Sequence, residues 1–311
     1  MIKPDDSSLD QQELLAVESR ARALMDRADV WNRFPTPVDD IVAAAKLRVA
    51  SKGMFDQAGF LAFIKEKTSQ AAETLKSAIS KVLGLYDANE KIIHIDDGVG
   101  ASKQTFLKLH ETGHHELPWH QKIFRVFQDC DKTLAPAVAD QFEREANNFA
   151  RFALFQGDAY KLRAADFPMG IKTPMELAKT FGASIYASAR EFARTHHRAC
   201  VVYVLEPMII TPGVVAHAQV RRVEPSPLFF AQFGCPMDVS IDVNHALGVL
   251  LPIGRKMTRP TDLRFRDKNG VDHECLGEAF KTTFNIFLLI YPVKALTSST
   301  IIVPISYAKG G

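Results

Sequence analysis

The stretch from Phe106 to His120, FLKLHETGHHELPWH, contains the clearest local indication of a chemistry in this 311-residue chain. Within it, His110, Glu111 and His114 form the pattern H-E-x-x-H. On a helix, two histidines four residues apart project from one face at a separation that suits a single Zn²⁺ ion. Glu111 lies beside that face, where its carboxylate can take a proton from a water that attacks a carbonyl. The stretch therefore predicts a helix with two zinc ligands and a general base.

The residues around the motif favour this interpretation. Phe106, Leu107 and Leu109 supply the apolar contacts of a buried helix, and Gly113 permits a close approach of the backbone to a neighbour. The alternative is a polar, partly exposed helix end whose histidines bind nothing, because the pentapeptide also occurs by chance.

Composition predicts a globular protein long enough for two domains. Hydrophobic residues make up 47% of the chain and charged residues 24%, and the formal net charge is +2. This small charge gives no global basic field to attract nucleic acid. The sequence shows neither a signal peptide nor an apolar run of about 18 residues, so we expect a cytoplasmic protein without a membrane partner. The four cysteines lack C-x-x-C spacing, which favours reduced, buried thiols.

The third zinc ligand has two candidates. His120 follows His114 by six residues, which is the spacing of the pattern H-E-x-x-H-x-x-G-x-x-H. That pattern uses glycine for a sharp turn, whereas this chain has Leu117 at the glycine position. The other candidate is Glu143, a carboxylate on a mostly apolar side of a helix predicted over 137–155, where a zinc ion would offset the cost of burying it. A salt bridge to an arginine is the alternative for Glu143, and His120 remains open as a ligand.

Two segments together resemble the ImmA/IrrE family of bacterial zinc metallopeptidases. They are QTFLKLHETGHH, from Gln104 to His115, and EREANNFA, from Glu143 to Ala150, and the resemblance covers residues 30–198. It implies three zinc ligands and one general base, namely His110, His114 and Glu143, with Glu111. Relatives of this kind cleave helix-turn-helix repressors and so switch stress-response or mobile-element genes, which implies a protein substrate of that type.

Three further residues are candidates to support the zinc ion or the transition state. Asn147 follows Glu143 by one helical turn and can orient a metal ligand. His197 can stabilise an oxyanion, although a cation near the negative end of a helix is a sufficient structural reason for it. His115 directly follows the motif.

The pattern of hydrophobic residues predicts an α+β chain. We expect an N-terminal helix in 1–29, a mainly helical domain over 30–198 with a helical insertion at 54–82, and a β-rich sensing or partner-binding domain over 199–311. The resemblance implies that the middle domain is zincin-like. It should contain a small β-hairpin, with strands LGLYD and KIIHID, just before the metal helix. The strands expected later are CVVYVLEP, GVVAHAQV, HALGVLLP, FLLIYPV and TIIVPISY.

A pair of short helices is expected over 174–194, joined at Gly182 and capped at Ser184. Such a pair imitates a DNA-reading unit, but its second helix offers few base-reading groups, so we expect no direct nucleic-acid binding. The sequence thus predicts a zinc-dependent endopeptidase. The alternative is a non-cleaving regulatory protein that sequesters a repressor and keeps zinc for structural reasons.

Overall fold

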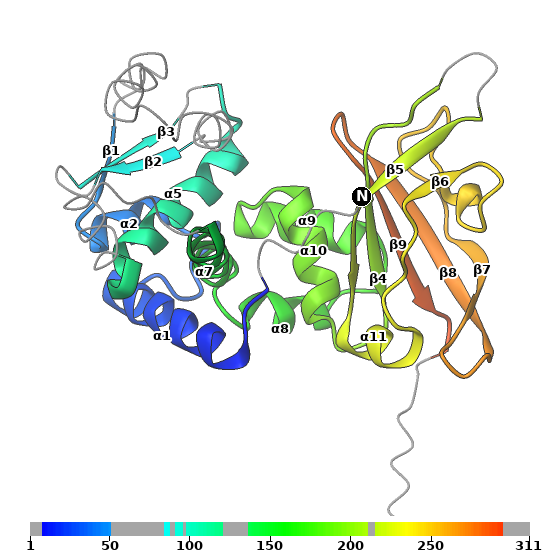
Figure 1. The fold of residues 1–311 in the computed structure, drawn as a ribbon, viewed down its shortest axis with the longest axis horizontal. Coiled ribbons are helices and arrows are strands. Elements are labelled where there is room, and N and C mark those ends of the chain that lie inside the picture. The colour runs from blue at the N-terminus through cyan, green and yellow to red at the C-terminus, as the bar shows by residue number, and fades with distance from the viewer. Residues whose placement is uncertain are drawn as a thin grey trace, which may run out of the picture. The chain divides into compact units, whose positions relative to one another are not determined.

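The computed structural model describes residues 8–50, 84–87, 91–95, 98–120, 136–210 and 215–294. The chain divides into two compact units, residues 2–192 and 193–311. The first unit is mainly helical and the second contains a large sheet, so the chain combines helices and strands as an α+β protein does (Figure 1). The insertion expected at 54–82 and the strand expected in TIIVPISY lie outside the described residues.

The first unit is organised around two long helices. α5 packs against α7 on one side and against a small sheet on the other (Figure 1). Its described helices are α1 (Gln11–Ala28), α2 (Val38–Ala44), α5 (Ala101–Glu116), α7 (Pro136–Phe155), α8 (Ala159–Ala165), α9 (Lys172–Phe181) and most of α10 (Ile185–Thr195).

α1 has a capped N-terminus and a buried apolar face. Asp10 caps its first turn through a reciprocal capping box with Glu13. Val17, Ala21 and Leu24 follow helical spacing and are fully buried, and α1 packs along α7. The predicted N-terminal helix is therefore confirmed, as part of the first unit rather than as a separate one.

The predicted hairpin precedes α5. β2 (Gly84–Asp87) and β3 (Ile92–Ile95) pair in an antiparallel manner, as expected for LGLYD and KIIHID. β1 (Arg48–Val49) adds to the other side of β3 in parallel, so the order is β1-β3-β2. Among the described strands, β2 is therefore an edge strand, and it contacts α5.

The predicted pair of short helices is also confirmed. α9 ends at Gly182, whose positive φ of 70° suits glycine, and the hydroxyl of Ser184 accepts a hydrogen bond from the backbone of Ala187 at the start of α10. α8 is tied to α10 because the Tyr160 hydroxyl donates to the Ser188 carbonyl at 2.7 Å.

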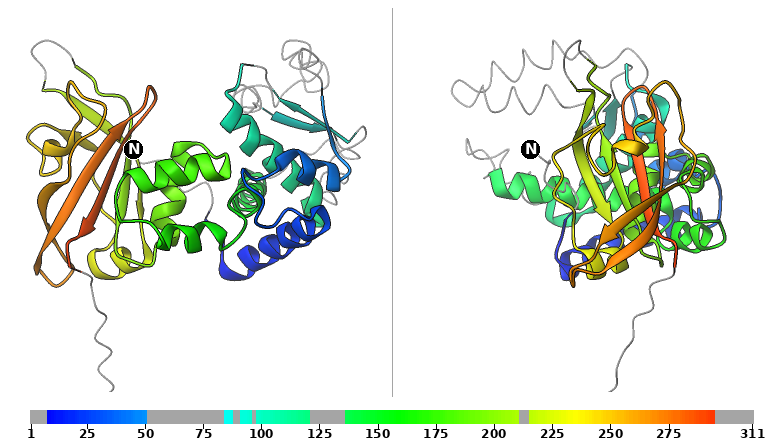
Figure 2. Two further views of the ribbon diagram at one scale, coloured as in Figure 1. Left: turned by 180° about the vertical axis from the view of Figure 1, so that it is seen from behind. Right: turned by 90° about the vertical axis from the view of Figure 1, so that its right-hand side faces the viewer.

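The second unit contains a six-stranded antiparallel sheet in the order β6-β5-β4-β9-β8-β7, which Figure 2 shows as one curved layer. Every residue of the central strands β4 and β9 is buried, so both faces of the sheet are covered there. The strands are β4 (Val201–Leu205), β5 (His217–Pro225), β6 (Ser240–Asp242), β7 (Thr261–Arg266), β8 (Asp272–Lys281) and β9 (Ile286–Pro292), with helix α11 (Pro227–Phe233) after β5.

One predicted strand is wrong. The segment HALGVLLP forms a 3₁₀ turn, Gly248–Leu250, because the Asp242 carboxylate accepts from the backbone of Asn244 and His245 and bends the chain. Gly248 then lies against the backbone carbonyl of Asp242, where a side chain would clash. β6, β7, β8 and α11 were not predicted from the sequence.

No helix in the described part of the chain is both long and apolar enough to cross a membrane.

Candidate metal centre

Three side chains from two helices converge in the first unit. His110 and His114 lie one turn apart on α5, with their Nε2 atoms 3.2 Å apart. Glu143 on α7 places one carboxylate oxygen 3.3 Å from Nε2 of His110 and the other 3.5 Å from Nε2 of His114. Among the described residues, this is the group of His, Cys, Asp and Glu side chains that could hold a metal ion.

The spacing of the two histidine nitrogens suits a tetrahedral ion. For bonds of about 2.0–2.1 Å to zinc, ligand atoms at the corners of a tetrahedron lie about 3.3 Å apart. The two Nε2 atoms lie 3.2 Å apart, close to that value, and each of them lies 3.3–3.5 Å from one of the two oxygens of Glu143. Two imidazoles and a carboxylate also form a known ligand set of catalytic zinc. The residues present therefore fit a bound divalent ion.

Close packing of α5 on α7 brings the donors together. A Cβ atom added at Gly113 would lie 3.1 Å from Cβ of Phe149, which is fully buried. On α7, Ala146 and Ala150 are also fully buried and add little bulk. We expect a larger residue at position 113 to push the helices apart, because an added Cβ already lies 3.1–3.2 Å from Phe149 and protein interiors are close-packed.

The group is open to solvent on one side. The side chains of His110 and His114 are each 10% exposed, whereas that of Glu143 is 60% exposed. From the sequence we expected Glu143 to be buried, and this was wrong; the cost of burying its carboxylate is therefore not a reason for a cation here. A site with one accessible side is typical of catalytic rather than structural zinc.

The charges around the group favour a cation between the three donors. Although the Glu143 side chain is 60% exposed, partial desolvation of its carboxyl group opposes ionisation; the adjacent rings of His110 and His114 outweigh this effect and hold the pKa of the carboxyl well below its usual range. Burial disfavours the charged form of His110, yet the Glu143 carboxylate next to its ring and the charge of Glu111 raise its pKa. The same contacts would stabilise a metal ion, which also carries positive charge.

The side chain of Asn147 forms a hydrogen bond with the ring of His110. Nδ1 of His110 is 3.1 Å from the side-chain oxygen of Asn147, one turn along α7 from Glu143. Because that oxygen can only accept, Nδ1 carries the proton, and Nε2 presents a lone pair to the group. Asn147 therefore orients the ring of His110, as we expected from the sequence.

His120 is not in the ligand group. Its ring is fully buried and stacks on Phe142 with centroids 4.0 Å apart. Nδ1 lies 3.0 Å from Nδ1 of His114, and Nε2 lies 2.6 Å from a carboxylate oxygen of Glu145. Both ring nitrogens thus have protein partners, and the structure brings Glu143, the other candidate, to the histidine pair.

The sequence did not single out Glu145. The indole of Trp119 donates to the same oxygen of Glu145 at 2.6 Å, and the Glu145 side chain is only 5% exposed. Burial would raise the pKa of Glu145, but hydrogen bonds from His120 and Trp119 hold it below its usual value. Burial also lowers the pKa of His120. Trp119 and His120, directly after Pro118, were the feature of the sequence that could have indicated such a residue, because buried polar rings need hydrogen-bond partners.

The other predicted residues have separate positions. Glu111 is 8% exposed, and its charge acts on His110 as described above. His115 is half-buried and hydrogen-bonds with the backbone of Ala45, away from the ligand group. His197 belongs to the second unit, where its ring stacks on His196 with centroids 4.6 Å apart.

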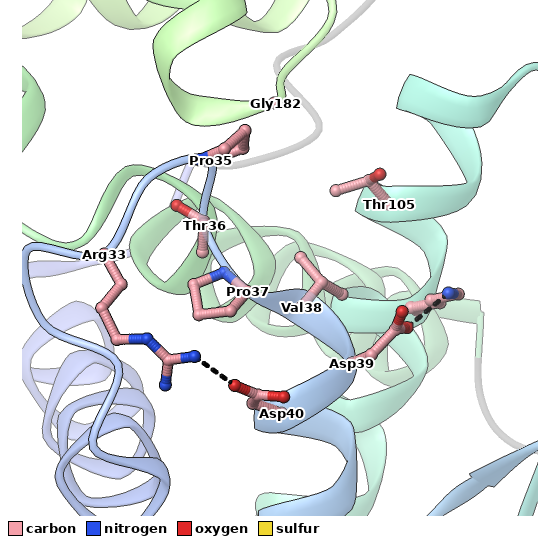
Figure 3. A pocket seen from close by; sticks show the side chains of 10 residues that line it. Arg33, Pro35, Thr36, Pro37, Val38, Asp39, Asp40, Thr105 and Gly182 are labelled. Atoms are coloured by element: carbon pink, nitrogen blue, oxygen red, sulfur yellow. Dashed lines mark hydrogen bonds and ion pairs between the residues drawn. The ribbon is translucent and has the colours of Figure 1, made fainter.

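A separate pocket of about 410 Å³ lies where α2 begins, next to α5 (Figure 3). Its charged residues are already paired, Lys108 with Asp39 and Arg33 with Asp40, each at 2.6 Å. None of the three metal-group residues lines it. We therefore assign the pocket no ligand.

Eleven chains of solved structures are similar to this chain. No family model matches the chain, and no curated protein does. The fold is similar to that of a solved structure described as a Mycobacterium tuberculosis transcriptional regulator, with a TM-score of 0.40 and 10% sequence identity. The match covers 89% of this chain and 82% of that one.

Proposed function

We propose that the protein is a zinc-dependent endopeptidase that hydrolyses a peptide bond in a specific protein substrate. The observation that carries this proposal is the convergence of His110, His114 and Glu143, whose ligand atoms lie within 4.8 Å of one another, with Glu111 buried and adjacent in sequence to His110. The resemblance of the two helices to ImmA/IrrE metallopeptidases supports a helix-turn-helix repressor as the substrate, cleaved in the cytoplasm to derepress stress-response or mobile-element genes.

The roles of the residues follow from their chemistry. A bound zinc ion supplies a Lewis acid that polarises the scissile carbonyl and acidifies water. His110, His114 and Glu143 hold the ion. Glu111 takes the proton of the attacking water and returns it to the leaving nitrogen, so the peptide C–N bond breaks as the new C–O bond forms.

The edge strand β2 supports the choice of an extended peptide as substrate. It contacts α5, and among the described strands it lies at the edge of its sheet, a position from which backbone groups can pair with a second chain. Main-chain pairing with β2 would hold a peptide in extended form near the metal helix. A globular substrate would need to unfold locally before it could pair in this way.

The proposal is tested with Glu111→Gln. We expect cleavage of a purified helix-turn-helix repressor to fall by about 10²–10⁴-fold, because general base catalysis contributes that much. Zinc content and repressor binding should not change, since Glu111 is outside the ligand group. Glu116→Gln, in the same helix and paired with Arg27, is the matched control and should cleave normally.

Full cleavage by Glu111→Gln would exclude the peptidase mechanism. An unchanged biological output in the absence of any cleavage would instead indicate the alternative, a binding protein that sequesters the repressor around a structural zinc ion.

A further inference from the structure

We infer that His120 and Glu145 are positioning residues that set the proton on the ring of His114 and thereby prepare it as a metal ligand. The three side chains form a continuous relay, with His114 and His120 3.0 Å apart at Nδ1 and His120 and Glu145 2.6 Å apart. This inference rests on the metal site of the proposed function but does not depend on peptide cleavage.

The direction of the relay follows from donor and acceptor chemistry. An ionised carboxylate such as that of Glu145 can only accept, so Nε2 of His120 donates to it. An imidazole with its single proton on Nε2 has an acceptor at Nδ1, so Nδ1 of His114 donates to His120. Nε2 of His114 is then left with a lone pair.

That lone pair points at the metal group. Nε2 of His114 lies 3.2 Å from Nε2 of His110 and 3.5 Å from Glu143. The opposite tautomer would put a proton where a metal ion must bind. The relay therefore selects the tautomer of His114 that can bind a metal ion directly.

The surroundings hold the relay rigidly. His120 is fully buried and stacked on Phe142, and Trp119 donates a second hydrogen bond to Glu145. Gln141 also donates to the other carboxylate oxygen of Glu145, at 3.3 Å. A polar network with few alternative partners is costly to rearrange, so the orientation of the His114 ring is fixed before metal binding.

The two metal-binding histidines are supported unequally. His110 donates to the neutral amide of Asn147, whereas His114 donates into a relay that ends in a buried carboxylate. A negative charge behind the donated proton increases the basicity of the ligand nitrogen. We therefore expect Nε2 of His114 to be the more basic of the two histidine ligand atoms.

The first test measures the affinity of the full-length protein for Zn²⁺ alone, in competition with a chromophoric chelator. We expect Glu145→Ala to weaken binding by about 10–100-fold, as removal of such partners does in other metal sites. Glu145→Gln should lose less, because its amide oxygen still accepts from His120. Asp140→Asn, an exposed carboxylate on the same helix, should match the wild type.

A second test needs no variant. Nitrogen-15 NMR of the imidazole rings should show His120 protonated at Nε2 alone, and His114 protonated at Nδ1, in both the metal-free and the Zn²⁺-loaded wild-type protein. This readout keeps the inference testable if Glu145→Ala does not fold.

The outcomes separate the relay from the metal site. A proton on Nδ1 of His120, or wild-type Zn²⁺ affinity in a folded Glu145→Ala protein, would overturn the relay. A wild-type protein that binds no Zn²⁺ would overturn the proposed function, while the tautomer of His120 would still decide whether the relay exists.

Discussion

Gly113 shows how one residue controls the geometry of the metal group. It lies between His110 and His114 at the contact of α5 with α7, where any Cβ would meet Phe149 at 3.1 Å. The ligand set spans both helices, so their separation sets the distance from Glu143 to the histidines. The glycine is required by this close approach rather than by its backbone angles.

We predict that Gly113→Val destabilises the first unit by about 1–3 kcal/mol, the usual effect of overpacking. It should also weaken Zn²⁺ binding, because α7 moves and Glu143 moves with it. Urea unfolding followed by tryptophan fluorescence checks the first effect, and chelator competition checks the second.

Gly100→Ala is the control for that substitution. Gly100 precedes the same helix, and nothing lies within 4 Å of an added Cβ. Its Zn²⁺ affinity should equal that of the wild type. If Gly113→Val bound Zn²⁺ equally well, close packing of α5 on α7 would not be what positions Glu143.

At the scale of elements, one serine joins a helix to the central sheet of the second unit. The fully buried hydroxyl of Ser226 caps α11 by accepting from the backbone of Phe229 at 3.2 Å, and it also accepts from the backbone of Cys200 at 3.0 Å, just before β4. Removal of this oxygen would leave the backbone N–H groups of Phe229 and Cys200 without their acceptor.

We predict that Ser226→Ala destabilises the second unit by about 1–3 kcal/mol, the range for buried polar groups that lose their partner. The matched control is Ser184→Ala, a cap that serves one donor on a half-buried helix end, for which we expect about 1 kcal/mol. Amide hydrogen exchange of each capped helix and its neighbours measures both effects. Equal losses of stability in Ser226→Ala and Ser184→Ala would argue against the stabilising effect of the second hydrogen bond that Ser226 accepts.

At the scale of the whole molecule, the metal group belongs to one unit. His110, His114 and Glu143 all lie within residues 2–192, as do both tryptophans, Trp31 and Trp119. Tryptophan fluorescence therefore reports the unfolding of the unit that contains the metal group and not that of the β-rich unit.

We predict that Zn²⁺ at 100 times its dissociation constant stabilises this unit by about 2.7 kcal/mol, because the ion binds the folded state. The midpoint of unfolding, followed by tryptophan fluorescence, should move to higher urea concentration with added Zn²⁺. It should return to its original value when EDTA removes the ion. Glu143→Ala should abolish the shift. A shift of the same size in Glu143→Ala would mean that the ion acts elsewhere on the chain.

The sequence predicted features that depend on neighbours along the chain. The spacing of His110 and His114, the core stripe of α1 and the α9–α10 break at Gly182 follow from helical periodicity and turn chemistry, and the structure has them. The segment around Gly248 was mistaken for a strand, since an apolar run does not reveal the Asp242 side-chain bonds that bend it.

The sequence by itself thus determined the helix that carries the histidine pair and placed Glu111 beside it, because 3.6 residues per turn fix those positions locally. Only the tertiary structure decided that Glu143 joins the pair while His120 turns to Glu145, and that Glu143 stays exposed. Glu143 reaches the histidine pair because α5 and α7 pack closely, with Gly113 against Phe149. Contacts between helices far apart in the chain have no fixed spacing in sequence, so periodicity cannot supply them.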